Sequence, residues 1–271
     1  VPGSSAKVEE MNFASGIIVA RRPVPTVEKT IESMEGFYPS VFCEPDAPRP
    51  ISGIQRVFRR PSSMATPGEG ITVGPDGEFG NFQNWVQSAR DLLKLDRTAQ
   101  AILIAEDDAL FAPGIRELLE RDLWPSADCG VVSLYCPNVT EYLSRGYGLF
   151  RTKRVGLLGA VSMVFPRHVL EAIVYDESVE TWRFGDTRFK PWTRKDVDEW
   201  IGIVLKKHGY SAWHYSPSLV LHFSPSAKKS NSSLGHAVAR GSRQCRQWVG
   251  HTPHDLLKAF PHDPCLPSHP V

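Results

Sequence analysis

Short runs of apolar residues recur along most of the chain and predict buried strands. Residues 101–105, Ala-Ile-Leu-Ile-Ala, form the most uniform run. Short apolar runs rich in β-branched residues are typical of strands that are covered on both faces. We predict strands at residues 14–20, 41–42, 101–105, 131–135, 159–165 and 219–222.

Between these runs the apolar residues follow helical spacing. Trp85, Ala89 and Leu92, for example, fall on one face of a helix. Proline suits a first helical turn and threonine suits an N-cap. We predict helices at residues 27–34 with Thr26 as the N-cap, at 84–95, from Pro113 onwards, at 166–174 and at 196–208. Residues 60–81 are rich in Gly, Pro and Ser and predict a long loop.

Strands that alternate with helices predict an α/β fold with a mainly parallel central sheet flanked by helices. We expect one domain over residues 13–235. Residues 1–12 are expected to be disordered or vector-derived, and residues 236–271 to form a C-terminal extension or tail. In sheets of this class ligands bind outside the carboxyl ends of the strands.

Composition and charge add few constraints. The chain has 271 residues, of which 41% are hydrophobic and 23% charged, as in an ordinary globular protein that can bury a core. The formal net charge is +1, so the overall field is weak. A polyanionic partner is therefore neither demanded nor excluded.

The cysteines and the hydropathy of the chain indicate the expected cellular compartment. The five cysteines form no CxxC pair, and we expect free thiols in a reducing cytosol. The sequence contains no run of about 18 apolar residues, so we predict no membrane span. The first ten residues also lack the order of a signal peptide. We therefore expect a cytoplasmic protein, although the loss of a Golgi-type anchor fits the sequence as well.

Three consecutive acidic residues, Glu106, Asp107 and Asp108, follow the strand predicted at residues 101–105. Like charges repel, and a divalent cation such as Mg²⁺ or Mn²⁺, which prefers oxygen ligands, offsets that repulsion. Since side chains alternate along a strand end, Glu106 and Asp108 are expected to face one site and Asp107 another. Alternatively, the triplet is a solvated loop with Asp108 near a helix N-terminus.

Residues 102–111, Ile-Leu-Ile-Ala-Glu-Asp-Asp-Ala-Leu-Phe, resemble the Glu-Asp-Asp version of the Asp-x-Asp motif of GT-A glycosyltransferases, and the chain looks family-2-like. The resemblance implies a GT-A (Rossmann-like) fold, a Mn²⁺ or Mg²⁺ ion and a nucleotide-sugar donor, with UDP as the expected carrier. By this resemblance Asp108 binds the metal directly. Glu106 lies near the ribose or sugar, and Asp107 lies near the sugar or a metal-bound water.

Residues 16–23, Gly-Ile-Ile-Val-Ala-Arg-Arg-Pro, resemble the first strand of that family and the loop that embraces the nucleotide. The resemblance points to Ala20, Arg21 and Arg22 as nucleotide-binding residues. Arg21 and Arg22 would otherwise be a solvated surface pair. The acidic loop after the second strand, with Glu44 and Asp46, is expected to contact the base.

Residues 159–167 resemble the segment that closes the donor sugar pocket, where Gly159 and Ala160 would let a sugar approach the backbone. A plain core strand explains the same residues. Residues 196–202, Asp-Val-Asp-Glu-Trp-Ile-Gly, resemble the acidic helix start that carries the general base of inverting enzymes. Asp198 and Glu199 are the candidates. Alternatively, both acids only interact with the helix dipole.

Residues 217–224, Pro-Ser-Leu-Val-Leu-His-Phe-Ser, resemble a Pro-Ser-Leu-Val-x-His segment of the family. This makes His222 a candidate second ligand of the metal or diphosphate, and Lys228 and Ser232 candidate phosphate contacts. A buried core histidine is the alternative reading of His222. The Phe-Ser-Pro sequence after His222 departs from the Ile-Gly that relatives often carry, so the phosphate loop is expected to differ.

The combined motifs predict transfer of a sugar to an acceptor hydroxyl, with inversion if Asp198 or Glu199 is the base. The acceptor is either a glycan or glycoside, or a hydroxymethylated base in phage-type DNA. Basic clusters around Arg56–Arg60, Arg183–Lys195 and Arg240–Arg246 suit phosphate contacts, or are ordinary solvated charges. A catalytically degenerate protein that binds a nucleotide sugar or nucleic acid is the non-enzymatic alternative.

Overall fold

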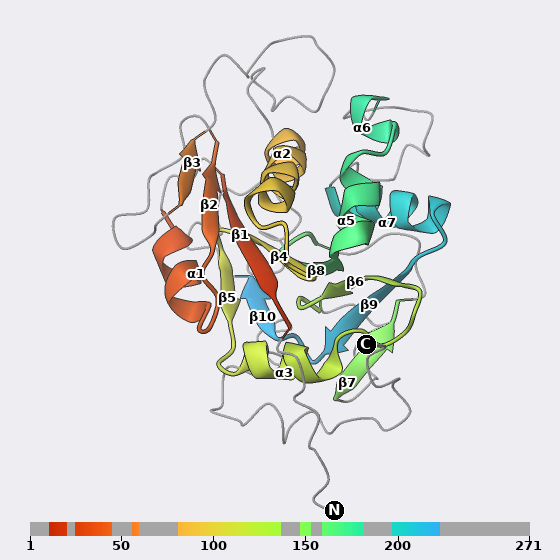
Figure 1. Cartoon of the computed structure of the whole chain (residues 1–271). Helices are drawn as coiled ribbons and strands as arrows, with labels where there is room; N and C mark the ends of the chain where they lie inside the picture. The colour runs from red at the N-terminus through yellow and green to blue at the C-terminus, as the bar shows by residue number, and fades with distance from the viewer. Residues whose placement is uncertain are drawn as a thin grey trace, which may run out of the picture.

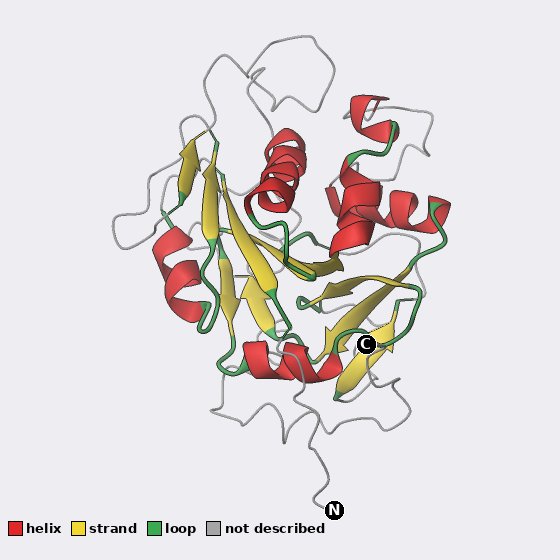
Figure 2. Ribbon diagram, viewed as in Figure 1, coloured by secondary structure: helices red, strands yellow, loops and turns green. Residues whose placement is uncertain are grey.

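The computed structural model describes residues 11–20, 25–44, 56–59, 81–136, 147–152, 159–181 and 197–222. Its elements are shown in Figures 1 and 2. In chain order they are β1 (Phe13–Val19), α1 (Val27–Ser33), β2 (Ser40–Cys43), β3 (Val57–Arg59), α2 (Asn81–Leu95), β4 (Ala101–Glu106), β5 (Ala109–Phe111), α3 (Ile115–Asp122), β6 (Cys129–Ser133), β7 (Gly148–Arg151), β8 (Ser162–Pro166), α5 (Arg167–Val174), α6 (Ser178–Thr181), α7 (Val197–Lys207), β9 (Ser211–Ser216) and β10 (Val220–His222).

An eight-stranded sheet in the order β3-β2-β1-β4-β8-β6-β9-β7 forms the centre of the described structure. Strands β3, β2, β1 and β4 are parallel, and β6 and β9 are parallel to each other. Strand β8 is antiparallel to both neighbours, and β7 is antiparallel to β9. The predicted α/β class with a mainly parallel central sheet is therefore confirmed, although three strands of this sheet, β3, β7 and β9, were not predicted.

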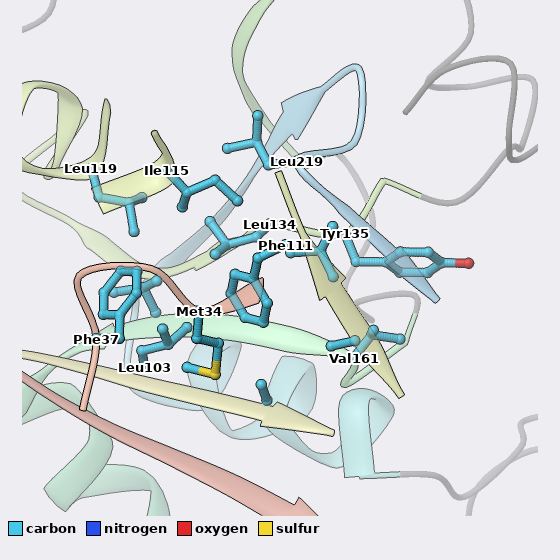
Figure 3. Close-up of a cluster of buried hydrophobic side chains, with 14 of the residues drawn as sticks. Met34, Phe37, Leu103, Phe111, Ile115, Leu119, Leu134, Tyr135, Val161 and Leu219 are labelled. Carbon is cyan, nitrogen blue, oxygen red and sulfur yellow. The ribbon is translucent and has the colours of Figure 1, made fainter. Parts of the chain in front are cut away.

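Helices cover both faces of this sheet (Figure 2). The side chains of β4 alternate: Ile102 and Ile104 pack with the buried faces of α2, α5 and α7, whereas Leu103 and Ala105 pack with those of α1 and α3. This is the period of two that a strand covered on both faces requires. Figure 3 shows part of the core that lies between the sheet and helices α1 and α3. None of the described helices has the length and apolarity needed to cross a membrane.

Strand β1 lies between β2 and β4: β2, the next strand in the chain, pairs on one side of it, and the later strand β4 pairs on the other. Such a reversal of strand order creates a crevice at the carboxyl ends of the two central strands, and this is where open α/β sheets bind ligands. Strand β1 pairs with β4 along the whole of β4, from Phe13 opposite Ala101 to Ile18 opposite Glu106. The acidic triplet therefore begins at the sheet position that most favours ligand binding.

The starts of α3 and α1 differ in detail from the sequence prediction. Helix α3 begins at Ile115, after Gly114 in the left-handed conformation (φ +80°), so Pro113 lies before the helix and not in its first turn. Thr26 precedes α1 as predicted, but its side chain makes no capping hydrogen bond with that helix.

Asp176 connects the ends of α5 and α7. Its buried carboxylate accepts a hydrogen bond from the Ser178 amide (2.9 Å) and one from Lys207 Nζ (3.0 Å), and it lies 2.9 Å from His208 Nε2. Burial alone would raise the pKa of this carboxyl, but the bonds from Ser178, His208 and Lys207 outweigh burial and hold the pKa well below its usual range. The ionised carboxylate thus stabilises the fold.

Replacing Asp176 with Asn should lower the free energy of unfolding at pH 7 by about 2 kcal/mol, since charge-assisted hydrogen bonds are lost. Because the pKa of Asp176 is depressed in the folded state, its contribution exists above the unfolded value of about 4 and is lost as the pH falls below that value. Urea unfolding of both proteins at pH 7 and at about pH 3 should therefore show a smaller difference at the lower pH.

Glu177→Gln is the matched control. The Glu177 carboxylate lies 2.9 Å from the same Lys207 Nζ, but its side chain is 87% exposed, so little stability should be lost. A difference between wild type and Asp176→Asn that is as large at pH 3 as at pH 7 would contradict the role of the ionised carboxylate.

Candidate metal centre and its surroundings

The acidic triplet lies in the turn between β4 and β5. Its backbone is bonded to both neighbouring strands, because the Glu106 amide donates to the Val161 carbonyl (2.9 Å) and the Asp107 amide donates to the Ile18 carbonyl (3.0 Å). Asp107 and Asp108 are each 1% exposed. The triplet is therefore part of the sheet edge and not a solvated loop, which was the alternative interpretation.

His222 is brought to the triplet by a second, two-stranded sheet. Strand β10 pairs antiparallel with β5, and His222 lies opposite Ala109, the residue after Asp108. His222 Nε2 lies 2.7 Å from Asp108 Oδ2 and 3.9 Å from Glu106 Oε2. The imidazole is only 4% exposed. The segment that ends at His222 and the segment that contains the triplet thus meet at one point.

Glu106, Asp108 and His222 each offer one ligand atom, and these atoms all lie within 4.8 Å of one another. Two carboxylates and an imidazole are a donor set that suits Mn²⁺ and, through the oxygens, Mg²⁺. Two carboxylates this close, Asp108 buried and Glu106 half-buried, repel each other, and a cation between them relieves that repulsion. The residues present therefore fit a divalent ion. Glu106, expected near the ribose or sugar, lies in this cluster.

Asp107 points away from the cluster and toward α1, as the alternation of side chains predicts. Its Oδ2 accepts a hydrogen bond from the Thr26 hydroxyl (3.2 Å), and its carbonyl accepts one from the Thr30 hydroxyl (2.7 Å). The expected position of Asp107 near a sugar or a metal-bound water stays a prediction. Thr26 is used for this long-range bond, which explains why it does not cap its own helix.

Residues 159–160 and the first turn of α7 also lie together. The Gly159 amide donates a hydrogen bond to Asp198 Oδ2. Gly159 has a left-handed backbone (φ +88°), and the ring of Tyr135 lies directly beside it. Ala160 is buried in the core below α2, α5 and α7, and Asp198 and Glu199 are half-buried in the first turn of α7.

Tyr135 connects this region to the metal cluster. Its ring centroid lies 6.2 Å from that of His222, with the two rings nearly perpendicular. Sequence analysis treated Tyr135 only as a strand residue. An aromatic residue at the carboxyl end of a predicted central strand is a signal that could have drawn attention to it, since ligand sites form at such ends.

The remaining candidate residues divide into described and undescribed ones. Ala20 follows β1, and the Glu44 amide donates to the Val19 carbonyl (2.9 Å), so both residues lie at the carboxyl ends of β1 and β2. Five candidates lie outside the described residues: Arg21, Arg22, Asp46, Lys228 and Ser232. Apart from Arg56 and Arg59, the basic residues proposed for nucleic-acid contact lie outside them too.

The metal cluster makes a direct prediction about ion binding. Wild-type protein should bind Mn²⁺, with a rise in melting temperature that a chelator reverses, because the ion binds only the folded site. Asp108→Asn should lower the Mn²⁺ affinity at least tenfold, since it removes one charged ligand. Glu117→Gln, at an exposed acid of α3, is the control and should bind Mn²⁺ like wild type. Equal affinity in the Asp108 variant would contradict the site.

Comparisons with known proteins leave the family open. No protein-family model matches this chain, and no curated protein matches it in sequence. Among solved structures, the crystal structure of mouse xyloside xylosyltransferase 1 in its apo form aligns with a TM-score of 0.41 and 10% sequence identity. The alignment covers 73% of this chain and 82% of the mouse chain. Similarity at this level does not establish a shared activity.

Proposed function

We propose that this protein is a metal-dependent glycosyltransferase that moves a sugar from a nucleotide sugar, with UDP as the carrier, to an acceptor hydroxyl. The observation that carries the proposal is the convergence of Glu106, Asp108 and His222 at the carboxyl edge of the sheet. The cluster lies beside the reversal of strand order between β1 and β4, where open α/β sheets bind nucleotides. The resemblance of residues 102–111 to the GT-A metal motif supports the same activity.

The donor set of the cluster fits a nucleotide diphosphate. Mn²⁺ and Mg²⁺ favour about six ligands, and Glu106, Asp108 and His222 offer three. The remaining positions suit water and phosphate oxygens. A bound ion would supply positive charge for the diphosphate that leaves during sugar transfer. The protein's own part is to hold the three ligand atoms within 4.8 Å of one another, at the end of β4, in the turn after it and on β10, so that the leaving group binds in one orientation.

The other candidate residues are assigned to the donor by their position. Ala20 and Glu44 lie at the carboxyl ends of β1 and β2, where the nucleoside would bind. We assign Arg21, Arg22 and Asp46 to the same loops, and Lys228 and Ser232 to the phosphates after β10. Gly159 and Ala160 are assigned to the sugar pocket, since a glycine and an alanine leave room for a ligand close to the backbone.

The proposed reaction needs a general base, because an acceptor hydroxyl is a weak nucleophile until its proton is removed. Asp198 and Glu199 in the first turn of α7 are the candidates. The acceptor oxygen forms a bond to the anomeric carbon while the bond from that carbon to the diphosphate breaks, and the proton passes to the carboxylate. A single displacement of this kind inverts the anomeric configuration.

A screen of nucleotide sugars with Mn²⁺ tests this proposal. At least one donor should raise the melting temperature in the presence of Mn²⁺ and not in the presence of a chelator. The same donor should be hydrolysed slowly or transferred to a glycoside acceptor, which release of the nucleoside diphosphate would measure. Asp108→Asn should lower turnover by about a hundredfold or more, since the charge that stabilises the leaving group is lost.

Two results would contradict the proposal in different ways. Donor binding without turnover in any acceptor mixture would point to a degenerate binding protein. Turnover that persists in chelator and in Asp108→Asn would exclude the metal-dependent mechanism. Glu117→Gln again serves as the control with unchanged turnover.

A further inference from the structure

Three hydroxyl side chains on one side of α1 contact the segment that carries the candidate metal ligands. Thr26, Thr30 and Ser33 are spaced at i, i+4 and i+7, a spacing that places residues on one face of a helix. Thr26 immediately precedes α1 and the other two lie within it. Thr26 and Thr30 are 2% and 1% exposed, and Ser33 is half-buried. We call these three residues the hydroxyl row.

Hydroxyl groups are an unusual choice for the inner face of a helix. That face normally carries apolar side chains, and a buried hydroxyl costs free energy unless it is hydrogen-bonded. Threonine and serine are also weaker helix formers than alanine or leucine. Each member of the row makes a hydrogen bond, and α1 lies beside β5 (Figure 1). The row therefore makes directed contacts that apolar side chains of the same size could not make.

The first two members of the row bind Asp107, which lies between the two acidic residues of the metal cluster. Thr26 Oγ1 donates to Asp107 Oδ2 (3.2 Å), and Thr30 Oγ1 donates to the Asp107 carbonyl oxygen (2.7 Å). The Asp107 amide donates to the Ile18 carbonyl of β1 (3.0 Å). The amide, the carbonyl and the carboxylate of Asp107 are thus all bonded, and these bonds set the direction in which the two flanking acids project.

The third member of the row holds the strand that pairs with β10. Ser33 Oγ accepts a hydrogen bond from the Phe111 amide (3.0 Å) and donates one to the Thr30 carbonyl (2.8 Å). Phe111 ends β5 and lies opposite Val220 in β10, the strand that carries His222. One face of α1 therefore supports both segments that supply the candidate ligands.

We propose that the hydroxyl row positions the candidate metal centre, and that Asp107 is the positioning residue through which Thr26 and Thr30 act on the two acidic ligands. Ser33 acts on His222 through the pairing of β5 with β10. The inference rests on the proposed function for the nature of the bound ion, whereas the contacts themselves are independent of it.

Isosteric variants of the two threonines test the proposal. Thr30→Val and Thr26→Val remove a hydroxyl and keep the size of the side chain. Each should weaken Mn²⁺ binding about tenfold, as removal of groups that support metal ligands does. Thr30→Ser and Thr26→Ser keep the hydroxyl and should bind Mn²⁺ nearly as wild type does. Thr98→Val, at an exposed threonine before β4, is the matched control and should not change the affinity.

A double-mutant cycle tests whether Thr26 acts through Asp107. Asp107→Ala removes the carboxylate that accepts the Thr26 hydroxyl. Thr26→Val should therefore weaken Mn²⁺ binding in the wild-type background and cause little further loss in the Asp107→Ala background, because residues that act through one contact are not additive. Equal losses in the two backgrounds would show that Thr26 acts by another route.

Two results with these variants would overturn the proposal. The first is wild-type Mn²⁺ affinity in both valine variants. The second is a loss of affinity that serine does not restore, since the methyl group and not the hydroxyl would then be responsible. Thermal unfolding of each variant without metal would show whether the fold is kept.

Hydrogen exchange provides a measurement that needs neither metal nor turnover. Exchange at the Asp107 amide should be faster in Thr30→Val than in wild type, and exchange at the Phe111 amide should be faster in Ser33→Ala. Unchanged exchange at both amides would reject the role of the row. If the wild-type protein binds Mn²⁺ but turns over no nucleotide sugar, the proposed function fails and the positioning role is still decided by the Mn²⁺ affinities. If it binds no Mn²⁺, both fail.

Discussion

Two carboxylates and one imidazole share a buried site at the edge of the sheet, and the surrounding structure serves to hold them there. Glu106 and Asp108 come from the end of β4, and His222 comes from β10, which pairs with the short strand β5 directly after the triplet. Bringing like charges together in a buried site costs free energy unless positive charge compensates. A divalent ion bound between the carboxylates would supply that charge.

The three acids of the triplet have two different surroundings, although they are consecutive in sequence. Glu106 and Asp108 face His222, whereas Asp107 is bonded to Thr26 at the start of α1. This division follows from the strand end, where successive side chains point in opposite directions. One short segment can therefore present ligands on one side and anchor itself to a helix on the other.

The elements that were predicted correctly are those whose structure is determined by residues close together in the sequence. The strand at residues 101–105 and its acidic end were predictable because an apolar run of that length is buried on both faces, and β4 occupies Ala101–Glu106. The antiparallel direction of β8 was not predictable, since nothing within residues 159–165 records which way the strand runs in the sheet. Strand β7 escaped prediction because its residues are half-buried or exposed and lack a clear apolar run.

The site residues could also be predicted only where a nearby sequence motif identified them. Asp108 and His222 were candidates from their motifs, but their 2.7 Å approach depends on the pairing of β5 with β10, which is a tertiary contact. The bond from Thr26 to Asp107 and the contact of Tyr135 with Gly159 also join segments that are distant in the chain. Thr26 resembled an N-cap because a threonine before a helix usually acts locally, and only the folded chain shows its longer-range partner.

Asp107 also ties the candidate metal cluster to the segments on either side of the loop after β1. Its amide is bonded to Ile18 in β1, its carboxylate to Thr26 and its carbonyl to Thr30 in α1. The loop that begins at Ala20 starts from β1 and leads to α1, so both of its ends are tied to the residue between the two acidic ligands. A displacement of that loop would pull on the triplet, and a displacement of the triplet would pull on the loop. In the proposed reaction the nucleoside and the diphosphate belong to one donor molecule, and a rigid link between their binding segments keeps the donor in a single orientation.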